Sequence, residues 1–395
     1  MKTRRDVLAL LAAGTALPFA GCASAPPPRG TGTLGVIVER SAGALTLVDT
    51  QQRVVLGRVE GLGDLSHASV VFSRDGASAY VFGRDGGLTM VDLPGQRIVK
   101  RVMQAGNSIG GAISQDGSLV AAQNYQPGGV KVFDARTLEL VADLPAEFAP
   151  GQRSRVVGLV DLPGQRFAFS LFDADAVWIA DVSDLAQPRL AKYPGIGRQP
   201  YDALVTPDGR HYIAGLFGED GLALLDLWQT SPAPRRILAG YGRGEAPLPV
   251  YKMPHLRGWA VAGRHAYLPA IGRHEVLVVD TLSWLEVARI PVAGQPVFVM
   301  ARPDGRQVWV NFAVPDYGRV QVIDTLSRQV VKTLEPGRAV LHMEFTPRSD
   351  AVWVSCRDDN VVRIIDTASF ATLASLPVDA PSGIFFTARA SRIGM

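Results

Sequence analysis

The histidines are the side chains of this sequence that could serve in most kinds of site, because imidazole titrates near neutral pH and binds transition metals such as iron and zinc. Two histidines, His67 and His255, lie in segments without a strand pattern, Gly63-Asp-Leu-Ser-His-Ala-Ser69 and Tyr251-Lys-Met-Pro-His-Leu-Arg-Gly-Trp259. Each is interpreted either as a metal ligand or as an ordinary loop residue. The remaining four are expected in solvated turns or, in the last case, inside an apolar strand: His211, His265, His274 and His342.

A flat metal complex is a ligand that two histidines from opposite parts of a ring could hold between them, since imidazole suits iron. If the complex carries carboxylates, arginines provide bidentate, charge-assisted partners. Five arginines lie near the same loops, although each alone is equally explained as a surface residue: Arg40, Arg84, Arg155, Arg198 and Arg257.

Other kinds of chemistry find little support in the composition. The two cysteines, Cys22 and Cys356, cannot form a disulfide framework, a cysteine-rich zinc site or an iron–sulfur cluster, and no Cys-x-x-Cys-His motif for covalent haem occurs. The formal net charge of +3 comes without a run of basic residues, so nucleic-acid binding is not expected. Gly61-Leu-Gly63 is only a fragment of a dinucleotide-binding fingerprint.

The elements that must position these side chains repeat along the chain. Apolar segments ending in aspartate recur at separations of 43, 42, 47, 45, 54, 44 and 42 residues. Between them lie turns such as Arg74-Asp-Gly76 and Pro303-Asp-Gly305, where glycine accepts a positive φ. This period predicts an all-β fold, a single eight-bladed β-propeller of four-stranded blades. The repeated aspartates are expected to be turn formers: Asp49, Asp92, Asp134, Asp181, Asp226, Asp280, Asp324 and Asp366.

The N-terminal segment resembles an export signal. Arg4 and Arg5 precede a short apolar stretch, as in a twin-arginine (Tat) signal, and Phe19-Ala-Gly-Cys22 resembles a lipobox. We therefore expect an export signal over residues 1–22, a proline-rich tether over 23–32 and the propeller over 33–395. The expected product is a periplasmic lipoprotein anchored to the membrane through Cys22; simple cleavage nearby without lipidation is the alternative.

Several stretches resemble the haem d1 domain of cytochrome cd1 nitrite reductases. The closest are His67-Ala-Ser-Val-Val-Phe-Ser-Arg-Asp-Gly76 and Val81-Phe-Gly-Arg-Asp-Gly-Gly-Leu-Thr-Met-Val-Asp-Leu93. The likeness continues through Met253-Pro-His-Leu-Arg-Gly258 and covers roughly residues 34–386. It implies a non-covalent iron tetrapyrrole, haem d1 or a dihydro-haem d1 precursor, with His67 as the axial ligand of its iron.

Two departures from the pattern of that family argue against nitrite reduction. Tyr201, followed by Asp202, stands where a second distal histidine is expected, and Asn107 replaces an arginine that would hold the tetrapyrrole. The resemblance implies His255, Tyr201 and Asp202 as catalytic candidates on the distal side. The resemblance also implies a set of residues that bind the pigment: Arg40, Arg84, Arg155, Arg198, Arg257, Asn107 and Tyr125.

A propeller of this kind without a c-type haem motif resembles the proteins of haem d1 biosynthesis. The resemblance implies binding of a haem d1 precursor and a part in its periplasmic maturation for cytochrome cd1 nitrite reductase, in denitrification. Expected partners are that reductase and other proteins of haem d1 biosynthesis. The sequence does not decide whether the protein forms a homodimer. Three roles remain as alternatives: a tetrapyrrole-modifying enzyme of the oxidoreductase type, a non-catalytic carrier that delivers pigment to the reductase, and a protein-docking propeller scaffold.

Overall fold

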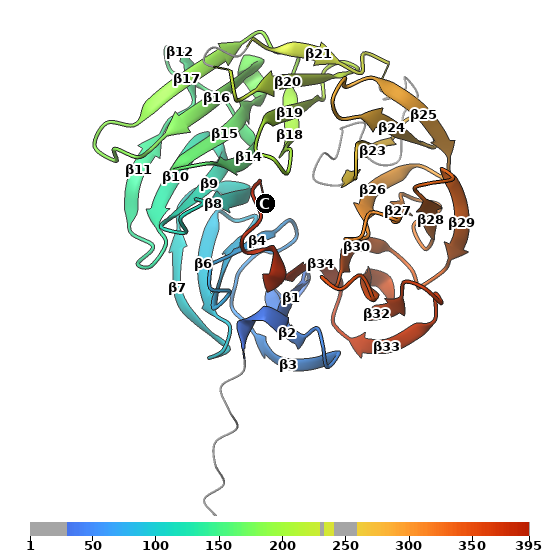
Figure 1. Cartoon of the computed structure of the whole chain (residues 1–395). Coiled ribbons are helices and arrows are strands. Elements are labelled where there is room, and N and C mark those ends of the chain that lie inside the picture. Colours follow the sequence, from blue (N-terminus) through green and yellow to red (C-terminus); the bar gives the residue numbers. More distant parts are fainter. Residues whose placement is uncertain (1–29, 230–232, 241–258, 395) are drawn as a thin grey trace, which may run out of the picture. The chain divides into compact units, whose positions relative to one another are not determined.

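Short strands separated by aspartate and glycine turns build the architecture. The computed structural model describes residues 30–229, 233–240 and 259–394, and all described strands belong to the unit Thr31–Met395. Eight four-stranded antiparallel sheets follow one another around a ring as the blades of a β-propeller (Figure 1). The fold predicted from the repeat is confirmed.

The blades are numbered in chain order, and their strands are given from the innermost to the outermost. The first four are blade 1, β34 (Pro381–Phe386), β1 (Leu34–Glu39), β2 (Ala44–Asp49) and β3 (Val54–Val59); blade 2, β4 (Ser69–Phe72), β5 (Ser78–Phe82), β6 (Gly87–Asp92) and β7 (Arg97–Met103); blade 3, β8 (Asn107–Ile113), β9 (Leu119–Gln126), β10 (Gly129–Asp134) and β11 (Leu140–Leu144); blade 4, β14 (Val156–Leu162), β15 (Arg166–Leu171), β16 (Ala176–Asp181) and β17 (Arg189–Pro194).

The other four are blade 5, β18 (Pro200–Val205), β19 (His211–Leu216), β20 (Leu222–Asp226) and β21 (Arg235–Ile237); blade 6, β22 (Ala260–Ala262), β23 (His265–Ala270), β24 (Glu275–Asp280) and β25 (Glu286–Pro291); blade 7, β26 (Pro296–Ala301), β27 (Gln307–Phe312), β28 (Val320–Asp324) and β29 (Gln329–Leu334); blade 8, β30 (Val340–Phe345), β31 (Ala351–Cys356), β32 (Val361–Asp366) and β33 (Thr372–Pro377). The described residues also form a small hairpin and four 3-10 helices: β12 (Glu147–Ala149), β13 (Gln152–Arg153), η1 (Thr31–Thr33), η2 (Phe172–Ala174), η4 (Arg357–Asp359) and η5 (Thr387–Arg389).

The repeated aspartates are turn formers, as predicted. Asp49 Oδ1 accepts hydrogen bonds from the backbone N–H groups of Gln51 and Gln52, at 2.9 and 2.7 Å, and Asp324 accepts one in the same way, at 2.7 Å. The glycine of the Asp-Gly turn has a φ of +67° at Gly76, a left-handed conformation that costs glycine little. Local turn chemistry therefore sets the ends of the strands.

Apolar side chains fill the spaces between neighbouring blades. Tyr80 and Phe82 of blade 2, for example, pack with Ile113 and Val120 of blade 3. Burial of such side chains between sheets is the main favourable term that holds the ring together. In the described parts of the chain, no helix is both long and apolar enough to cross a membrane.

The first and last strands of the ring close it. β34 pairs with β1 in an antiparallel ladder that includes Gly35 and Phe386, and Thr387 Oγ1 donates to the carbonyl of Leu34 at 2.8 Å. The segment after η5 reaches the middle of the ring, where Figure 1 shows the C-terminal end, and Gly394 N–H donates to Asp161 of blade 4 at 3.0 Å. The C-terminal residues thus contact blades far from their own.

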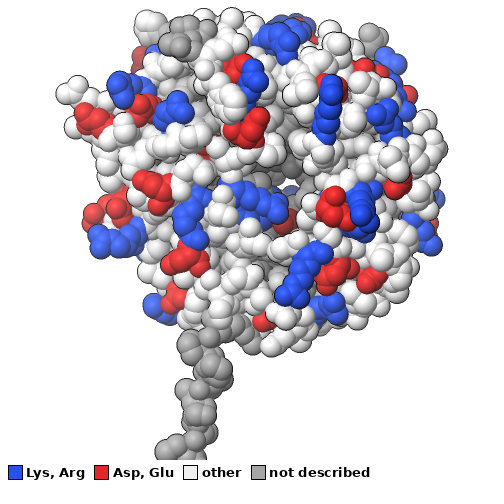
Figure 2. All heavy atoms as spheres, in the orientation of Figure 1, with Lys and Arg blue, Asp and Glu red and all other residues white. Residues whose placement is uncertain are grey.

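The two faces of the ring differ in their connections. One face, called here the site face, carries the links from the outermost strand of a blade to the innermost strand of the next and those between second and third strands. The opposite face, called here the turn face, carries the repeated aspartates and the Asp-Gly turns. On the face drawn in Figure 2, basic and acidic side chains alternate around the ring instead of forming one patch of a single sign.

Candidate functional site

The site face collects the candidate residues that the sequence singled out. Each lies in a connection of that face or at the strand end beside it, because the blade period returns the chain to this face twice per blade. His255 and Arg257 lie outside the described residues. The candidates placed on the site face are Arg40, His67, Arg84, Asn107, Tyr125, Arg155, Arg198, Tyr201 and Asp202.

His67 is exposed in the loop between β3 and β4. Asp64 Oδ1 accepts from Ser66 N–H at 2.8 Å, and the backbone N–H of Arg84, in the next loop, donates to the carbonyl of Asp64, also at 2.8 Å. The hydrogen bonds from Ser66, and then the charges of Arg84 and Arg40, hold the pKa of Asp64 below its usual value. The loop that carries His67 is therefore tied to a loop that presents an arginine.

A pair of tyrosines joins blades 3 and 5 on this face. The hydroxyls of Tyr125, on β9, and Tyr201, on β18, form a hydrogen bond. Burial, together with the neighbouring Tyr201, raises the pKa of Tyr125 far above its ordinary value. Both phenols can donate hydrogen bonds, and Tyr125 does not act as a base near neutral pH.

Aromatic rings support Tyr201 from two loops. Phe172 and Phe217 lie with ring centroids 5.9 and 6.1 Å from that of Tyr201. The guanidinium of Arg155 stacks over Phe172 at 4.2 Å, and that of Arg84 lies 5.8 Å from the ring centre of Tyr125. Two arginines therefore flank one aromatic cluster.

The arginines of the site face are not equivalent. Arg155 is held by Asp173, with Nη2 to Oδ1 at 2.5 Å and its backbone N–H to Oδ2 at 2.8 Å, and hydrogen bonding to Asp173 raises the pKa of Arg155. Arg198 lies near Glu219, with Nε to Oε2 at 3.9 Å and its backbone N–H to Oε1 at 2.7 Å. Arg84 forms no ion pair with a described carboxylate. Of these three, Arg84 is the charge best placed to meet an added anion.

On the innermost strands of blades 2 and 3, two buried polar atoms lack a hydrogen-bond partner among the described residues. They are Oδ1 of Asn107, at the start of β8, and Oγ of Ser69, at the start of β4. Unpartnered buried polar atoms are destabilising, so this region can accept hydrogen bonds from a bound group. No cluster of three histidine, cysteine or acidic side chains that could hold a metal is found in the described part of the chain. The exposed imidazole of His67 suits an iron whose other ligands come from a macrocycle.

Two of the other histidines, His211 and His265, begin strands instead of lying in the solvated turns predicted for them. His211 was expected in a solvated turn, but it begins β19 and is only 9% exposed, because its ring packs edge-on against Trp284 at 5.4 Å. His274 does lie in an exposed turn, and His265, partly buried, begins β23. His342 is a strand residue as expected, and burial lowers its pKa to about 3.

Four residues that contact the candidates were not identified from the sequence: Phe172, Asp173, Phe217 and Glu219. They lie in equivalent connections, Phe172-Asp-Ala-Asp175 after β15 and Phe217-Gly-Glu-Asp220 after β19. The signal that could have revealed them is the spacing of 45 residues between the two phenylalanines, which equals the spacing from Asp181 to Asp226. The pattern is a phenylalanine with an acidic residue one or two positions later, and it recurs after one blade period in the connections of blades 4 and 5.

Comparisons with known proteins agree with this picture. The family described as Cytochrome D1 heme domain matches residues 29–390. Protein NirF of Pseudomonas aeruginosa is 60% identical over 379 residues, which cover 95% of this chain and 97% of that protein. Protein NirF of Stutzerimonas stutzeri is 59% identical over 393 residues, covering 99% of this chain and 100% of that protein.

A solved structure shares the whole ring. The dihydro-heme d1 dehydrogenase NirN in complex with DHE superimposes with a TM-score of 0.80 at 25% identity, covering 95% of this chain and 80% of that chain. AztD from Citrobacter koseri, with a TM-score of 0.63 and 13% identity, shows similarity of fold alone.

Proposed function

Since the chain belongs to the cytochrome d1 haem-domain family and, within it, to the NirF proteins, we propose that it acts in haem d1 biosynthesis by binding a haem d1-type tetrapyrrole on the site face. The observation that carries this proposal is the convergence, on one face, of an exposed histidine, an arginine without an ion-pair partner in the described chain and the partly buried tyrosine pair. The complex of the related dehydrogenase NirN with DHE supports the class of ligand.

His67 would bind the iron of the pigment, and Arg84, with Arg40 near it, would meet its carboxylates. Asn107 would add a hydrogen bond from the inner edge, where its side-chain oxygen is buried without a described partner. The bound group would supply the metal and the conjugated ring, while these residues fix where it lies.

The distal side would consist of Tyr201, Asp202 and His255, the last outside the described residues. Because the pKa of Tyr125 is raised, the tyrosine pair orients a substituent by donating hydrogen bonds rather than by removing protons near neutral pH. This environment suits binding and orientation of a tetrapyrrole better than rapid proton delivery to a small oxyanion.

Titration with purified haem d1 tests the site. Wild-type protein should shift the Soret band and saturate, whereas His67→Ala should lose the axial-ligand spectrum and bind more weakly. His265→Ala, at the start of β23 on the other side of the ring, is the matched control and should behave like wild type. An unchanged spectrum and affinity in His67→Ala would refute the assignment.

The mass of the pigment separates a catalyst from a carrier. Incubation of the protein with dihydro-haem d1 and an electron acceptor should yield the oxidised pigment if the protein is an enzyme, and unchanged pigment if it is a carrier. We also propose a periplasmic location with a lipid anchor at Cys22; replacing Cys22 by serine should move the protein from the membrane fraction to the soluble fraction.

A further inference from the structure

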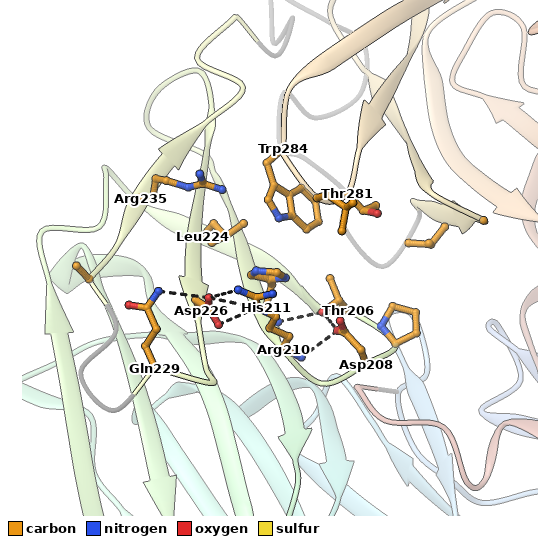
Figure 3. Close-up of a pocket in the computed structure, with 15 residues that line it drawn as sticks. Thr206, Asp208, Arg210, His211, Leu224, Asp226, Gln229, Arg235, Thr281 and Trp284 are labelled. Carbon is orange, nitrogen blue, oxygen red and sulfur yellow. Dashed lines mark hydrogen bonds and ion pairs between the residues drawn. The ribbon is translucent and has the colours of Figure 1, made fainter.

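A cavity opens on the turn face, opposite to the proposed tetrapyrrole site. It lies between blades 5 and 6 and has a volume of about 530 Å³, within the range of small-molecule pockets. Figure 3 shows Arg235, Leu224 and His211 from blade 5 on one side of the opening and Trp284 from blade 6 on the other. None of the described residues proposed for the tetrapyrrole lines it.

The cavity exists because blade 5 has a short outer strand. β20 pairs with β21 only at Leu222, Ala223 and Leu224, so the last part of β20, up to Asp226, has no partner in that ladder. The other seven blades each carry an outer strand of five to seven residues, whereas β21 has three. Among the described residues, no strand extends over the gap between the two blades at the turn face.

Trp284 places an unusual donor in this gap. It is the fourth residue after Asp280, a position that has a positive φ of 59° and that is occupied by Leu138 and Phe370 in two other blades. Trp284 is only 2% exposed, and its indole N–H has no hydrogen-bond partner among the described residues. Figure 3 shows the ring nitrogen on the side that faces Leu224 and Arg235. A buried N–H without an acceptor is destabilising, and a bound acceptor would relieve this cost.

The other polar groups of the cavity divide into satisfied acceptors and available donors. Asp226 is engaged by Arg210 at 2.8 Å, and Asp208 accepts from Thr206 Oγ1 at 2.5 Å. Arg235, by contrast, is exposed and forms no ion pair with a described acidic residue. Burial lowers the pKa of His211, so its imidazole is neutral near pH 7 and can donate from one nitrogen.

We propose that this cavity binds a small organic carboxylate with an apolar, preferably planar, body. The carboxylate would accept from the indole N–H of Trp284 and from the guanidinium of Arg235, and the body would pack against Leu224 and Leu282. Donors without acceptors select an anion, and the apolar side chains among the lining residues, Leu224, Leu282 and Trp284, offer an apolar body a surface that a small inorganic anion would not use.

A pair of probes with the same body tests the proposal. 1-Naphthylacetate carries a carboxylate, and 1-naphthylacetamide is its neutral counterpart. Calorimetric titration of the purified full chain should give saturable binding of the carboxylate with an affinity at least tenfold higher than that of the amide. Equal affinities, or no saturable binding at millimolar concentrations, would overturn the proposal.

Two variants locate the binding. Trp284→Phe keeps an aromatic ring but removes the N–H, and Arg235→Gln removes the charge; each should weaken binding of 1-naphthylacetate by at least fivefold. Trp353→Phe removes another buried N–H without a described partner, in blade 8, and Arg306→Gln removes an exposed charge of blade 7. Both controls should bind like wild type. Wild-type affinity in Trp284→Phe and Arg235→Gln would refute the assignment.

Two further checks keep the result unambiguous. Arg235 is exposed, so Arg235→Gln is expected to fold even if Trp284→Phe does not, and circular dichroism verifies both. Excess haem d1 should not displace the probe; displacement would assign the probe to the site face and overturn the proposal of a second site.

Discussion

The hydroxyl of Tyr125 on β9 meets that of Tyr201 on β18 in a hydrogen bond between residues that are 76 positions apart. The pair bridges blades 3 and 5, and the loop of blade 4 adds Phe172 to the same cluster. The contact therefore depends on the curvature of the ring, which brings the site-face ends of these strands together. It also couples the candidate distal residue Tyr201 to a partly buried phenol whose pKa is raised.

Replacing Tyr201 by phenylalanine should lower the pKa of Tyr125 toward its ordinary value, because the hydrogen bond and the neighbouring phenol both raise it. An alkaline titration followed at the tyrosinate absorption band measures this pKa. The contribution of Tyr125 is obtained by subtracting the titration curve of the protein with Tyr125→Phe from that of the same protein without it, once in wild type and once in Tyr201→Phe. Tyr193→Phe, on the outer strand β17, is the control. An unchanged pKa in Tyr201→Phe would show that burial alone is responsible.

Arg84→Gln should weaken binding of haem d1 about tenfold or more, since a charge-assisted hydrogen bond contributes roughly 1.5–3 kcal/mol. Arg155→Gln should cost less, because Arg155 is already neutralised by Asp173. Arg189→Gln, whose guanidinium is exposed beside Asp181, should leave affinity unchanged. Equal losses for all three, measured by absorbance titration, would mean that only overall charge matters.

Asp161 should make stability depend on pH. Burial raises the pKa of its carboxyl to about 6, against the hydrogen bonds from Gln115 and Gly394 and the charge of Arg74. The folded chain then binds more protons than the unfolded chain between about pH 4 and pH 6, so this contribution to stability is present below that window and is lost as the pH rises through it. The loss amounts to at most about 3 kcal/mol.

The Asp161→Asn variant tests this contribution. Its free energy of unfolding, measured with urea at pH 4.5 and pH 7.5, should fall less over that interval than that of wild type. Asp350→Asn, at a half-exposed position, should keep the wild-type difference. Identical changes in wild type and Asp161→Asn would contradict the prediction.

Thr387→Val should destabilise the closure of the ring. The hydroxyl of Thr387 lies 2.7 Å from the carbonyl oxygen of Thr31 and 2.8 Å from that of Leu34, so the substitution leaves these acceptors without their donor. The expected cost is about 1–3 kcal/mol, measured as a lower urea midpoint. Thr372→Val, at the exposed start of β33, should change the midpoint little.

The amino-acid sequence predicts the ring because the information is local and repeated. Aspartate at a strand end binds backbone N–H groups two or three residues further on, as at Asp49, and glycine accepts the positive φ of the next turn. Eight repetitions of that pattern predict the number of blades and, through the period, place the candidates from Arg40 to Asp202 on one face. The resemblance to the haem d1 domain agrees with the family match and adds the axial role predicted for His67.

Contacts between blades could not be predicted in this way, because they join residues whose separation is unrelated to the turn pattern. The chain alone does not show that Asp173 neutralises Arg155, that Gly394 binds Asp161, or that His211 is buried against Trp284. Ring closure and the packing of adjacent sheets bring these groups together, and a three-residue strand, β21, leaves the cavity beside Trp284. Local turn chemistry thus determines the blades and the face of the site, whereas only the tertiary structure decides which charges and donors remain available, since burial and pairing depend on neighbours from other blades.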